Sequence, residues 1–284
     1  MAFKRSRGSI HIQRPGWIVY AALAAVIVAS LFPFYWSLLI GSGDSTTVRD
    51  PNMSWIPGAN FIENSITVIR NPAVNFWKAL GNSIIVSTTV GITTVVLSTL
   101  AGFAFAKLRF KGNSVLFVAV IATMAVPVQL GIVPLYILMA EYGWTGTLGA
   151  VILPALVTAF GVFWMTQYMQ QALPTELIEA ARVDGCNMIR TFWHVAIPAA
   201  RPAAAMLFLF TFVTAWNNFL WPLIILDQSN PTLPVALSML QANYFVDYSL
   251  VLAGVLLATV PLLILFVFTG RQLVTGIMQG AIKG

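Results

Sequence analysis

Residues 202–226 read PAAAMLFLFTFVTAWNNFLWPLIIL and contain no Asp, Glu, Lys or Arg. An α-helix needs about 20 predominantly apolar residues to cross the ~30 Å hydrocarbon core of a bilayer, so this stretch predicts a membrane-spanning helix. Five further charge-free stretches are long enough to span, namely residues 17–40, 79–106, 114–140, 142–175 and 248–270. Hydrophobic residues make up 58% of the chain and charged residues 8%. The sequence therefore predicts an all-α, polytopic membrane protein with six transmembrane helices, and an ordinary soluble globule is excluded.

The charged residues between these stretches predict the orientation. With the N-terminus in the cytoplasm, only Arg49, Arg70 and Lys78 of the 15 Lys and Arg residues lie outside. This bias follows the positive-inside rule, so the net charge of +6 reflects membrane topology and does not indicate a nucleic-acid partner. We expect residues 1–16 to form a cytoplasmic tail and residues 17–284 to form one membrane domain. The first apolar stretch is too long for a cleaved signal peptide.

Polar side chains inside the predicted spans are candidates for a solute path. Gln129 lies in the third span, and Asn217 and Asn218 lie in the fifth, next to Trp216. Amides pair with sugar hydroxyls and indole rings stack on sugar rings, so these residues suit a neutral saccharide. Hydrogen bonding between helices is the alternative reading of the same residues.

The stretch ELIEAARVDG, residues 176–185, is unusually rich in charge for this chain. Pro174 and Thr175 indicate a helix start with Thr175 as N-cap, and Gly185 indicates the helix end. The apolar side chains of the helix are expected to share one arc, which comprises Leu177, Ile178, Ala180 and Ala181. Such a short amphipathic helix is marginal alone, so it packs either on its own subunit or against a partner.

A longer motif favours the partner. The segment EAARVDG, nine further residues and VAIP, residues 179–198, resembles the cytoplasmic signature of permease subunits in binding-protein-dependent ABC importers. The matching positions are Glu179, Ala180, Ala181, Gly185 and Pro198. The segments GFAFAKLRFKG, VPLYILM, FVTAWNNFLWPLIIL and GRQLVTGIMQGAIKG resemble the maltose-type carbohydrate permeases, and the last is similar to the smaller, second membrane subunit of that system. The resemblance covers residues 75–284.

This resemblance implies a coupling helix in the cytoplasmic loop of about residues 170–201, between spans 4 and 5, which docks on a separate ATPase. Glu179 would make the polar contact, Ala180 and Ala181 the close packing, and Gly185 the turn. The residues after Met278 would also reach towards the ATPase. The implied partners are a second permease in a heterodimer, two ATPase subunits and an extracytoplasmic sugar-binding protein that contacts residues 227–247. The location would be the plasma membrane of a prokaryote, with both termini cytoplasmic.

The sequence argues against catalysis by this chain. It has no phosphate-binding G-x-x-x-x-G-K-[ST] motif, so ATP and Mg²⁺ are expected on the partner ATPase, and no cofactor or metal on this chain. The histidines, His11 and His194, lie outside the predicted spans, which disfavours a membrane enzyme. The absence of ionisable side chains in the spans disfavours an ion-coupled secondary transporter. A permease for a solute other than sugar remains the alternative.

Overall fold

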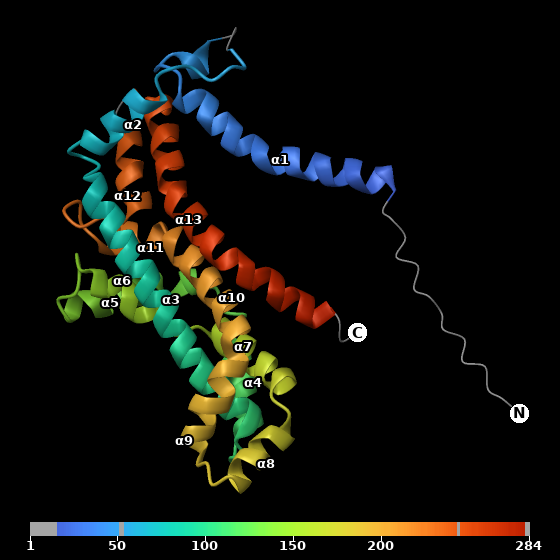
Figure 1. Ribbon diagram of the computed structural model, residues 1–284. Helices are drawn as coiled ribbons and strands as arrows, with labels where there is room; N and C mark the ends of the chain where they lie inside the picture. The colour runs from blue at the N-terminus through green and yellow to red at the C-terminus, as the bar shows by residue number, and fades with distance from the viewer. Residues whose placement is uncertain (1–15, 51–53, 243–244, 282–284) are drawn as a thin grey trace, which may run out of the picture.

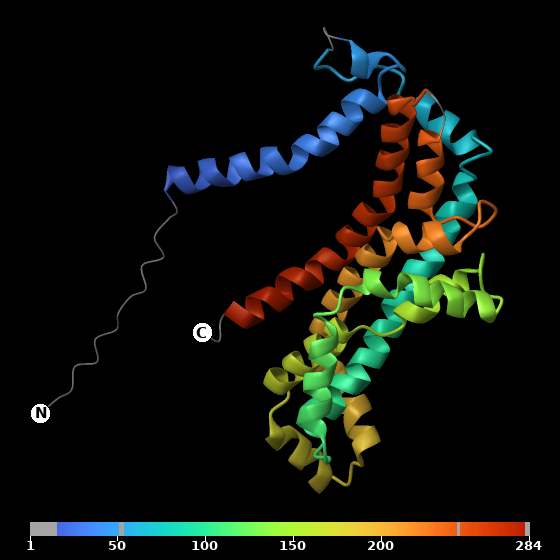
Figure 2. The same ribbon diagram turned by 180° about the vertical axis from the view of Figure 1, so that it is seen from behind.

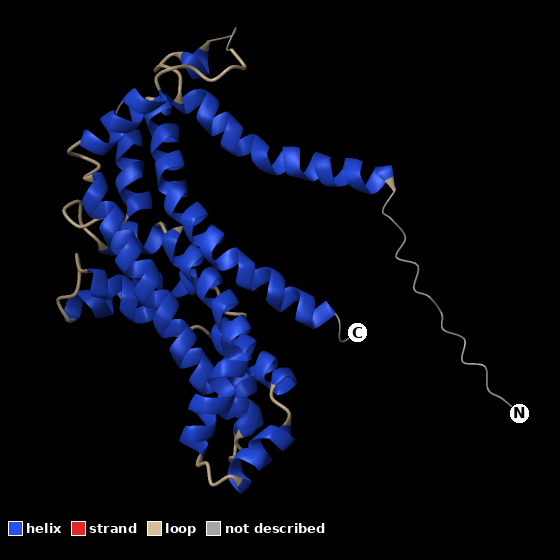
Figure 3. Ribbon diagram, viewed as in Figure 1, coloured by secondary structure: helices blue, strands red, loops and turns tan. Residues whose placement is uncertain are grey.

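The computed structural model describes residues 16–50, 54–242 and 245–281, with only the backbone of residues 49 and 270–281. The described part of the chain is helical and contains no strand (Figure 3). Its α-helices are α1 (Trp17–Gly41), α2 (Phe61–Arg70), α3 (Phe76–Lys107), α4 (Asn113–Thr123), α5 (Ile132–Glu141), α6 (Leu148–Ile152), α7 (Ala159–Ala172), α8 (Thr175–Val183), α9 (Met188–Thr191), α10 (Ile197–Trp216), α11 (Leu220–Ile225), α12 (Leu233–Ser238) and α13 (Tyr248–Ala281). The predicted all-α class is confirmed. The tail of residues 1–15 and the last three residues lie outside the described residues.

Five helical segments of the described chain are long and apolar enough to cross a membrane. They are Trp17–Gly41, Phe76–Lys107, Leu148–Ala172, Met188–Trp216 and Tyr248–Thr269. The predicted third span is different, because residues 113–123 and 128–141 form two helices bent by 87°. The bend falls at Pro127, which cannot donate a backbone hydrogen bond and has extended geometry, with ψ at 124°. The charge-free stretch is therefore a bent pair and not one straight helix.

The centre of the bundle is a close packing of α3 against α7 and α10 (Figure 1). One face of α3 carries a stripe of small residues that are all buried, namely Ser83, Ser87, Gly91, Thr94, Ser98 and Gly102. A Cβ atom at Gly91 would lie 2.8 Å from the ring of Phe208, and one at Gly102 would lie 2.8 Å from the backbone of Met165. The stripe therefore brings helices of this same chain together, as small residues do in membrane bundles.

Gly102 offers a test of this packing. Gly102→Ala should destabilise the chain by about 1 to 3 kcal/mol, because the new methyl group would meet backbone atoms that cannot move aside. Gly81→Ala, on the same helix but with open space around it, should be neutral or stabilising by up to about 1 kcal/mol. Thermal unfolding of the two purified variants in detergent measures the difference. Equal midpoints would contradict the proposed tight contact.

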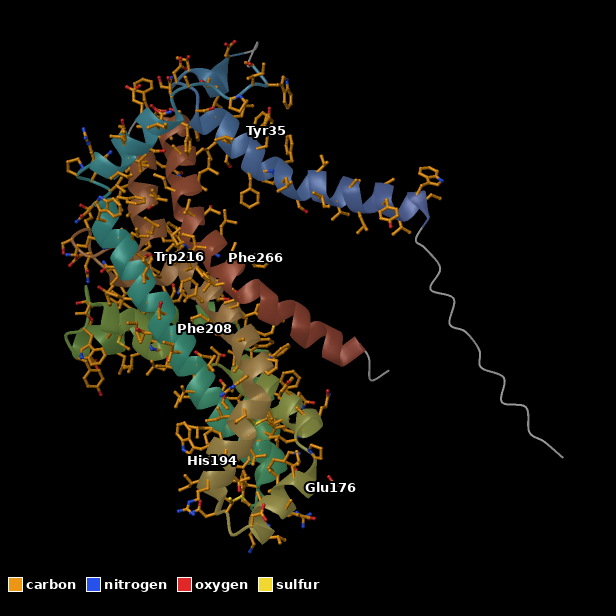
Figure 4. The ribbon with its side chains drawn as sticks, viewed as in Figure 1. Tyr35, Glu176, His194, Phe208, Trp216 and Phe266 are labelled. Atoms are coloured by element: carbon orange, nitrogen blue, oxygen red, sulfur yellow. The ribbon has the colours of Figure 1, made fainter. Side chains whose placement is uncertain are left out.

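The first helix lies apart from the rest of the bundle. Only the last residues of α1 are buried, where Gly41 approaches the backbone of Ala253 in α13. The remaining length of α1 diverges from the other helices, and the second half of α13 diverges as well (Figures 1 and 2). Phe266 marks this diverging part of α13 (Figure 4). Both segments expose apolar side chains, so they must be covered by lipid or by another protein.

The two ends of the bundle differ. Helices α8 and α9 form one end, which we call the α8 end (Figure 1). At the opposite end, the C-terminus of α1 meets α2 and the start of α13 (Figures 1 and 2). Residue numbers along α3 increase from this opposite end towards the α8 end, so the α3 residues that a site contacts give the depth of that site in the bundle.

Candidate functional site

The short charged helix predicted from ELIEAARVDG is present as α8. Thr175 is its first helical residue and makes no side-chain cap, so the prediction of Thr175 as N-cap is wrong; extended Pro174 holds the N-cap position. Glu176 lies in the first turn, where it interacts electrostatically with Lys107 at the end of α3. Gly185 follows the helix with φ at +78°, a conformation that favours glycine. The local geometry thus gives α8 a sharp exit.

One narrow face holds α8 on the bundle. Ile178 is 4% exposed and Ala181 is 8% exposed, and Ile178 belongs to a buried cluster with Phe103 of α3 and Phe192. Leu177, Glu179 and Ala180 are exposed. The predicted single apolar arc is therefore split, because positions i and i+3 face the bundle while their neighbours face outward. The two alanines have different environments: Ala181 packs inside the chain and Ala180 is free to meet a partner.

The segment after α8 leads into the bundle through an irregular turn. Residues 192–196 form a π-helical turn directly before Pro198, which is exposed near the start of α10. Pro198 has no N–H to donate to the carbonyl one turn earlier, and the wider π-helical turn accommodates this missing hydrogen bond without ending the helix. Nδ1 of His194 lies 2.9 Å from the carbonyl oxygen of Arg190. The helix therefore continues from residue 188 to residue 216 as a single span.

Two apolar side chains at the α8 end are strongly exposed: Val183, the last residue of α8, is 88% exposed, and Ile189 of α9 is 70% exposed. Helical spacing already predicts Val183 on the charged arc of α8, whereas the exposure of Ile189 was not predicted from the sequence. Together with Leu177 and Ala180 they give the α8 end an apolar outer surface next to the carboxylate of Glu179. Such a combination is typical of a protein docking surface.

A cavity of about 360 Å³ lies between α3, α7 and α10. Its polar lining consists of Thr158, Thr211, Thr214 and Asn218, and its aromatic lining of Phe160 and Phe210. The two phenyl rings meet edge to face with centroids 6.5 Å apart. No ionisable side chain lines the cavity. Within the described residues the side-chain amide of Asn218 makes no hydrogen bond, so it is available to a neutral, hydroxyl-bearing solute.

The other three path residues predicted from the sequence lie elsewhere. Trp216 is 2% exposed and stacks on Phe212, in the middle of the bundle and far from Glu176 (Figure 4). Asn217 is exposed, its amide donates to the carbonyl of Val213 at 3.0 Å, and it lines a second cavity of about 430 Å³ between α10, α12 and α13. Gln129 is exposed at the bend between α4 and α5. The structure does not bring these four side chains into one site.

The residues that the structure describes contain no group of three or more His, Cys, Asp or Glu side chains that could hold a metal ion. Cys186 is a half-buried free thiol at the exit of α8. The candidate sites are thus a docking surface at the α8 end and an uncharged cavity that is open along the exposed side chains of Phe160, Phe210 and Thr214.

Comparison with known proteins identifies relatives along almost the whole chain. Residues 67–273 match the family model described as binding-protein-dependent transport system inner membrane component. The arabinooligosaccharides transport system permease protein AraQ of Halalkalibacterium halodurans is 32% identical over 271 residues, which cover 94% of this chain and 96% of the relative. The lactose transport system permease protein LacG of Rhizobium radiobacter is 34% identical, covering 95% and 97%. The sn-glycerol-3-phosphate transport system permease protein UgpE of Salmonella typhi is 29% identical, covering 89% and 92%.

The fold also has a solved counterpart. A chain from the crystal structure of a bacterial ABC transporter involved in the import of the acidic polysaccharide alginate superposes with a TM-score of 0.75. The alignment covers 89% of this chain and 95% of that chain, at 21% sequence identity. At this identity the similarity concerns the fold, and it agrees with the helical arrangement described above.

Proposed function

Because this chain belongs to the family of inner membrane components of binding-protein-dependent transport systems, we propose that it is the permease subunit of an ATP-driven importer for a di- or oligosaccharide. It is a transport subunit and not an enzyme, since its relatives are permeases and ATP hydrolysis occurs on separate ATPase subunits. The observation that carries the substrate class is the full-length similarity to permeases of arabinooligosaccharide and lactose transport systems. The uncharged cavity lined by hydroxyl, amide and phenyl groups supports it.

We assign the α8 end to the cytoplasm and the α2 end to the outside, with six crossings if the bent pair α4 and α5 counts as one. The distribution of Lys and Arg supports this orientation. The loop after α7 then forms the coupling segment between spans 4 and 5. ATP and Mg²⁺ would bind only to the partner ATPase on the cytoplasmic side.

The docking surface for the ATPase would be the outer face of α8. The exposed carboxylate of Glu179 would meet a cationic group, and exposed Ala180 would allow close approach. Buried Ala181 would hold α8 on the bundle, and exposed Pro198 would belong to the docking surface at the start of α10. Gly185 would permit the sharp exit. The C-terminal residues after Met278 remain a proposed second contact, and their side chains lie outside the described residues.

The importer would be completed by a second permease, two ATPase subunits and an extracytoplasmic sugar-binding protein. The exposed length of α1 and the diverging part of α13 up to Phe268 support a second membrane subunit, because the described residues leave their apolar side chains exposed. The described part of residues 227–247, which comprises residues 227–242 and 245–247, would lie towards the outer side, where a binding protein would dock. Two different permeases would then enclose the solute path between them.

Solute uptake tests the substrate class directly. Cells that carry the chain with its transport partners should take up a labelled neutral di- or oligosaccharide, and cells lacking the chain should not. Labelled sn-glycerol 3-phosphate is the informative comparison, since UgpE is a relative and the described cavity has no cation to bind a phosphate. Uptake of that ester in preference to every saccharide would overturn the sugar assignment while leaving the importer assignment intact.

Gln129, Asn217, Asn218 and Trp216 remain our proposed path residues, and Asn218 has the best geometry. Asn218→Leu should raise the KM for uptake about 5- to 10-fold, as expected for one lost hydrogen bond to a neutral hydroxyl, with normal assembly. Asn217→Leu provides the matched comparison on the other side of α10. A kinetic change in Asn217→Leu alone would place the path in the cavity between α10, α12 and α13. Unchanged kinetics in both variants would leave only a packing role for this asparagine pair.

A further inference from the structure

The chain between α11 and α12 folds back onto α3 through a buried asparagine. Nδ2 of Asn82 donates to Oδ1 of Asn230 at 3.0 Å and to the carbonyl oxygen of Pro231 at 2.9 Å. Asn82 is 7% exposed, and both of its amide donors are thus used. One residue further along α3, the hydroxyl oxygen of Ser83 accepts from the backbone N–H of Leu233 at 2.7 Å.

The same network reaches the link between α5 and α6. Nδ2 of Asn230 donates to the carbonyl oxygen of Gly146 at 3.1 Å, and the N–H of Gly146 donates to the carbonyl oxygen of Ile225 at 2.8 Å. Gly146 has φ at +76°, and a Cβ atom there would lie 2.9 Å from Asp227 Oδ2. The hydroxyl of Ser229 donates to Asp227 Oδ1 and lowers the pKa of that carboxyl, so it stays ionised. We call Asn82, Gly146, Asn230 and Pro231 the Asn82 clasp.

The clasp holds the end of α11, a helix that packs against residues of the cavity lining. Helix α11 begins just after the cavity residue Asn218 and ends at Ile225, which is bonded to the clasp. Within α11, Nε1 of Trp221 donates to the carbonyl oxygen of Ala150 at 3.0 Å. Trp221 and Ile225 are buried against Val86, Val90 and Val151, which also line the cavity.

Depth along α3 places α11 on one particular side of the cavity. Val86 and Val90 line the cavity, whereas Asn82 of the clasp lies one turn nearer the α2 end. Helix α11 crosses the bundle on the α2 side of α5 and α6 (Figures 1 and 2). Helix α11 contributes no side chain to the cavity lining, but Trp221 and Ile225 pack behind the lining residues Val86, Val90 and Val151, and the clasp fixes the far end of α11.

We propose that Asn82 is a positioning residue for transport, because its clasp holds α11 behind the lining residues that close the cavity towards the outside. This inference rests on the proposed function, in which a solute passes from that side to the cavity. Loss of the clasp would leave buried carbonyl and amide groups without partners, and α11 would separate from α3 more often. The cavity would then be accessible from outside when it should be closed.

Accessibility of a cysteine in the cavity wall tests this proposal without depending on the solute. In a Cys186→Ala background, Thr214→Cys gives this chain a single thiol, which lies in the part of the cavity lining that α10 contributes. Asn82→Asp keeps the size of the side chain but turns the donor into an acceptor that faces two other acceptors. In intact cells with the complete transporter, Asn82→Asp should increase labelling of the cysteine by an externally added, membrane-impermeant thiol reagent about 10-fold.

The chain supplies a matched control in Asn64, whose Nδ2 donates to the carbonyl oxygens of Gly41 and Gly43, both at 2.9 Å, away from α11. Asn64→Asp should leave labelling unchanged. Equal labelling in Asn82→Asp and the parent, or an equal increase in Asn64→Asp, would overturn the proposal. If Asn82→Asp fails to accumulate, Asn230→Ala removes the bonds of Asn230 to Asn82 and to Gly146, and it must also increase the labelling. Failure of the sugar assignment would appear separately, as absent sugar uptake in cells that carry the unmodified chain with its partners.

Discussion

Gly185→Leu is expected to abolish solute uptake while the chain remains folded in the membrane. The left-handed conformation at Gly185 costs a leucine about 1–2 kcal/mol, and a new side chain at the docking surface adds about 1–3 kcal/mol of misfit against the ATPase. Together these terms, about 2–5 kcal/mol, correspond to a loss of about 30-fold or more in productive docking. Within the described chain a Cβ atom at this position meets nothing within 4 Å, so folding itself is spared a clash.

Gly143 provides the control for backbone strain. It has φ at +67°, open space around it, and a place in the link between α5 and α6, away from α8. Gly143→Leu should therefore carry the same conformational cost and retain uptake. Uptake by cells and the amount of chain in the membrane are measured for both variants. Comparable loss in the two variants would attribute the effect to strain, and normal uptake by Gly185→Leu would refute the coupling role.

Glu179→Ala should weaken association with the ATPase by about 10- to 100-fold, the effect expected when a hydrogen bond to a charged group is lost. Glu179 is exposed on α8, whereas Ile178 beside it is buried. The truncation therefore removes an outward contact and leaves the packing of α8 on the bundle intact. Titration of the purified permease pair with the ATPase gives the dissociation constant. Solute-stimulated ATP hydrolysis should fall in parallel at fixed protein concentration.

Glu63 on α2 is the matched control, because it is an exposed glutamate at the opposite end of the bundle. Glu63→Ala should leave ATPase affinity unchanged. A normal dissociation constant for Glu179→Ala would show that the carboxylate makes no contact, and the docking surface would then consist of the apolar side chains Ala180, Val183 and Leu177 alone.

The membrane segments were predictable from charge-free length, and the turn at Gly185 from residue type. The 87° bend in the third charge-free stretch was harder to predict from the sequence. Proline is frequent in straight membrane helices, and the outcome at Pro127 depends on which neighbouring groups satisfy the freed carbonyls. The end of the fifth span at Trp216 was missed for a similar reason, since the run of apolar residues continues through α11.

The solute cavity could not be predicted as a site. Asn217 and Asn218 are adjacent in sequence, so on a helix their side chains point about 100° apart, and the structure places them in different cavities. The choice between them depends on how α10 is rotated against α3 and α7. That rotation is set by the close approaches at Gly91 and Gly102, which are tertiary contacts.

The helical span from residue 188 to residue 216, which includes the π-helical turn, contains 29 residues and is about 43 Å long, with the proposed ATPase surface near one end and Asn218 just beyond the other. A long helix of this kind would transmit a displacement at either end to the other end. Thermodynamic reciprocity requires that if nucleotide binding changes the affinity for sugar, sugar must change the affinity for nucleotide by the same factor. Sugar bound in the cavity would thus change the affinity of the ATPase for nucleotide, so an unloaded and a loaded transporter would differ in nucleotide occupancy.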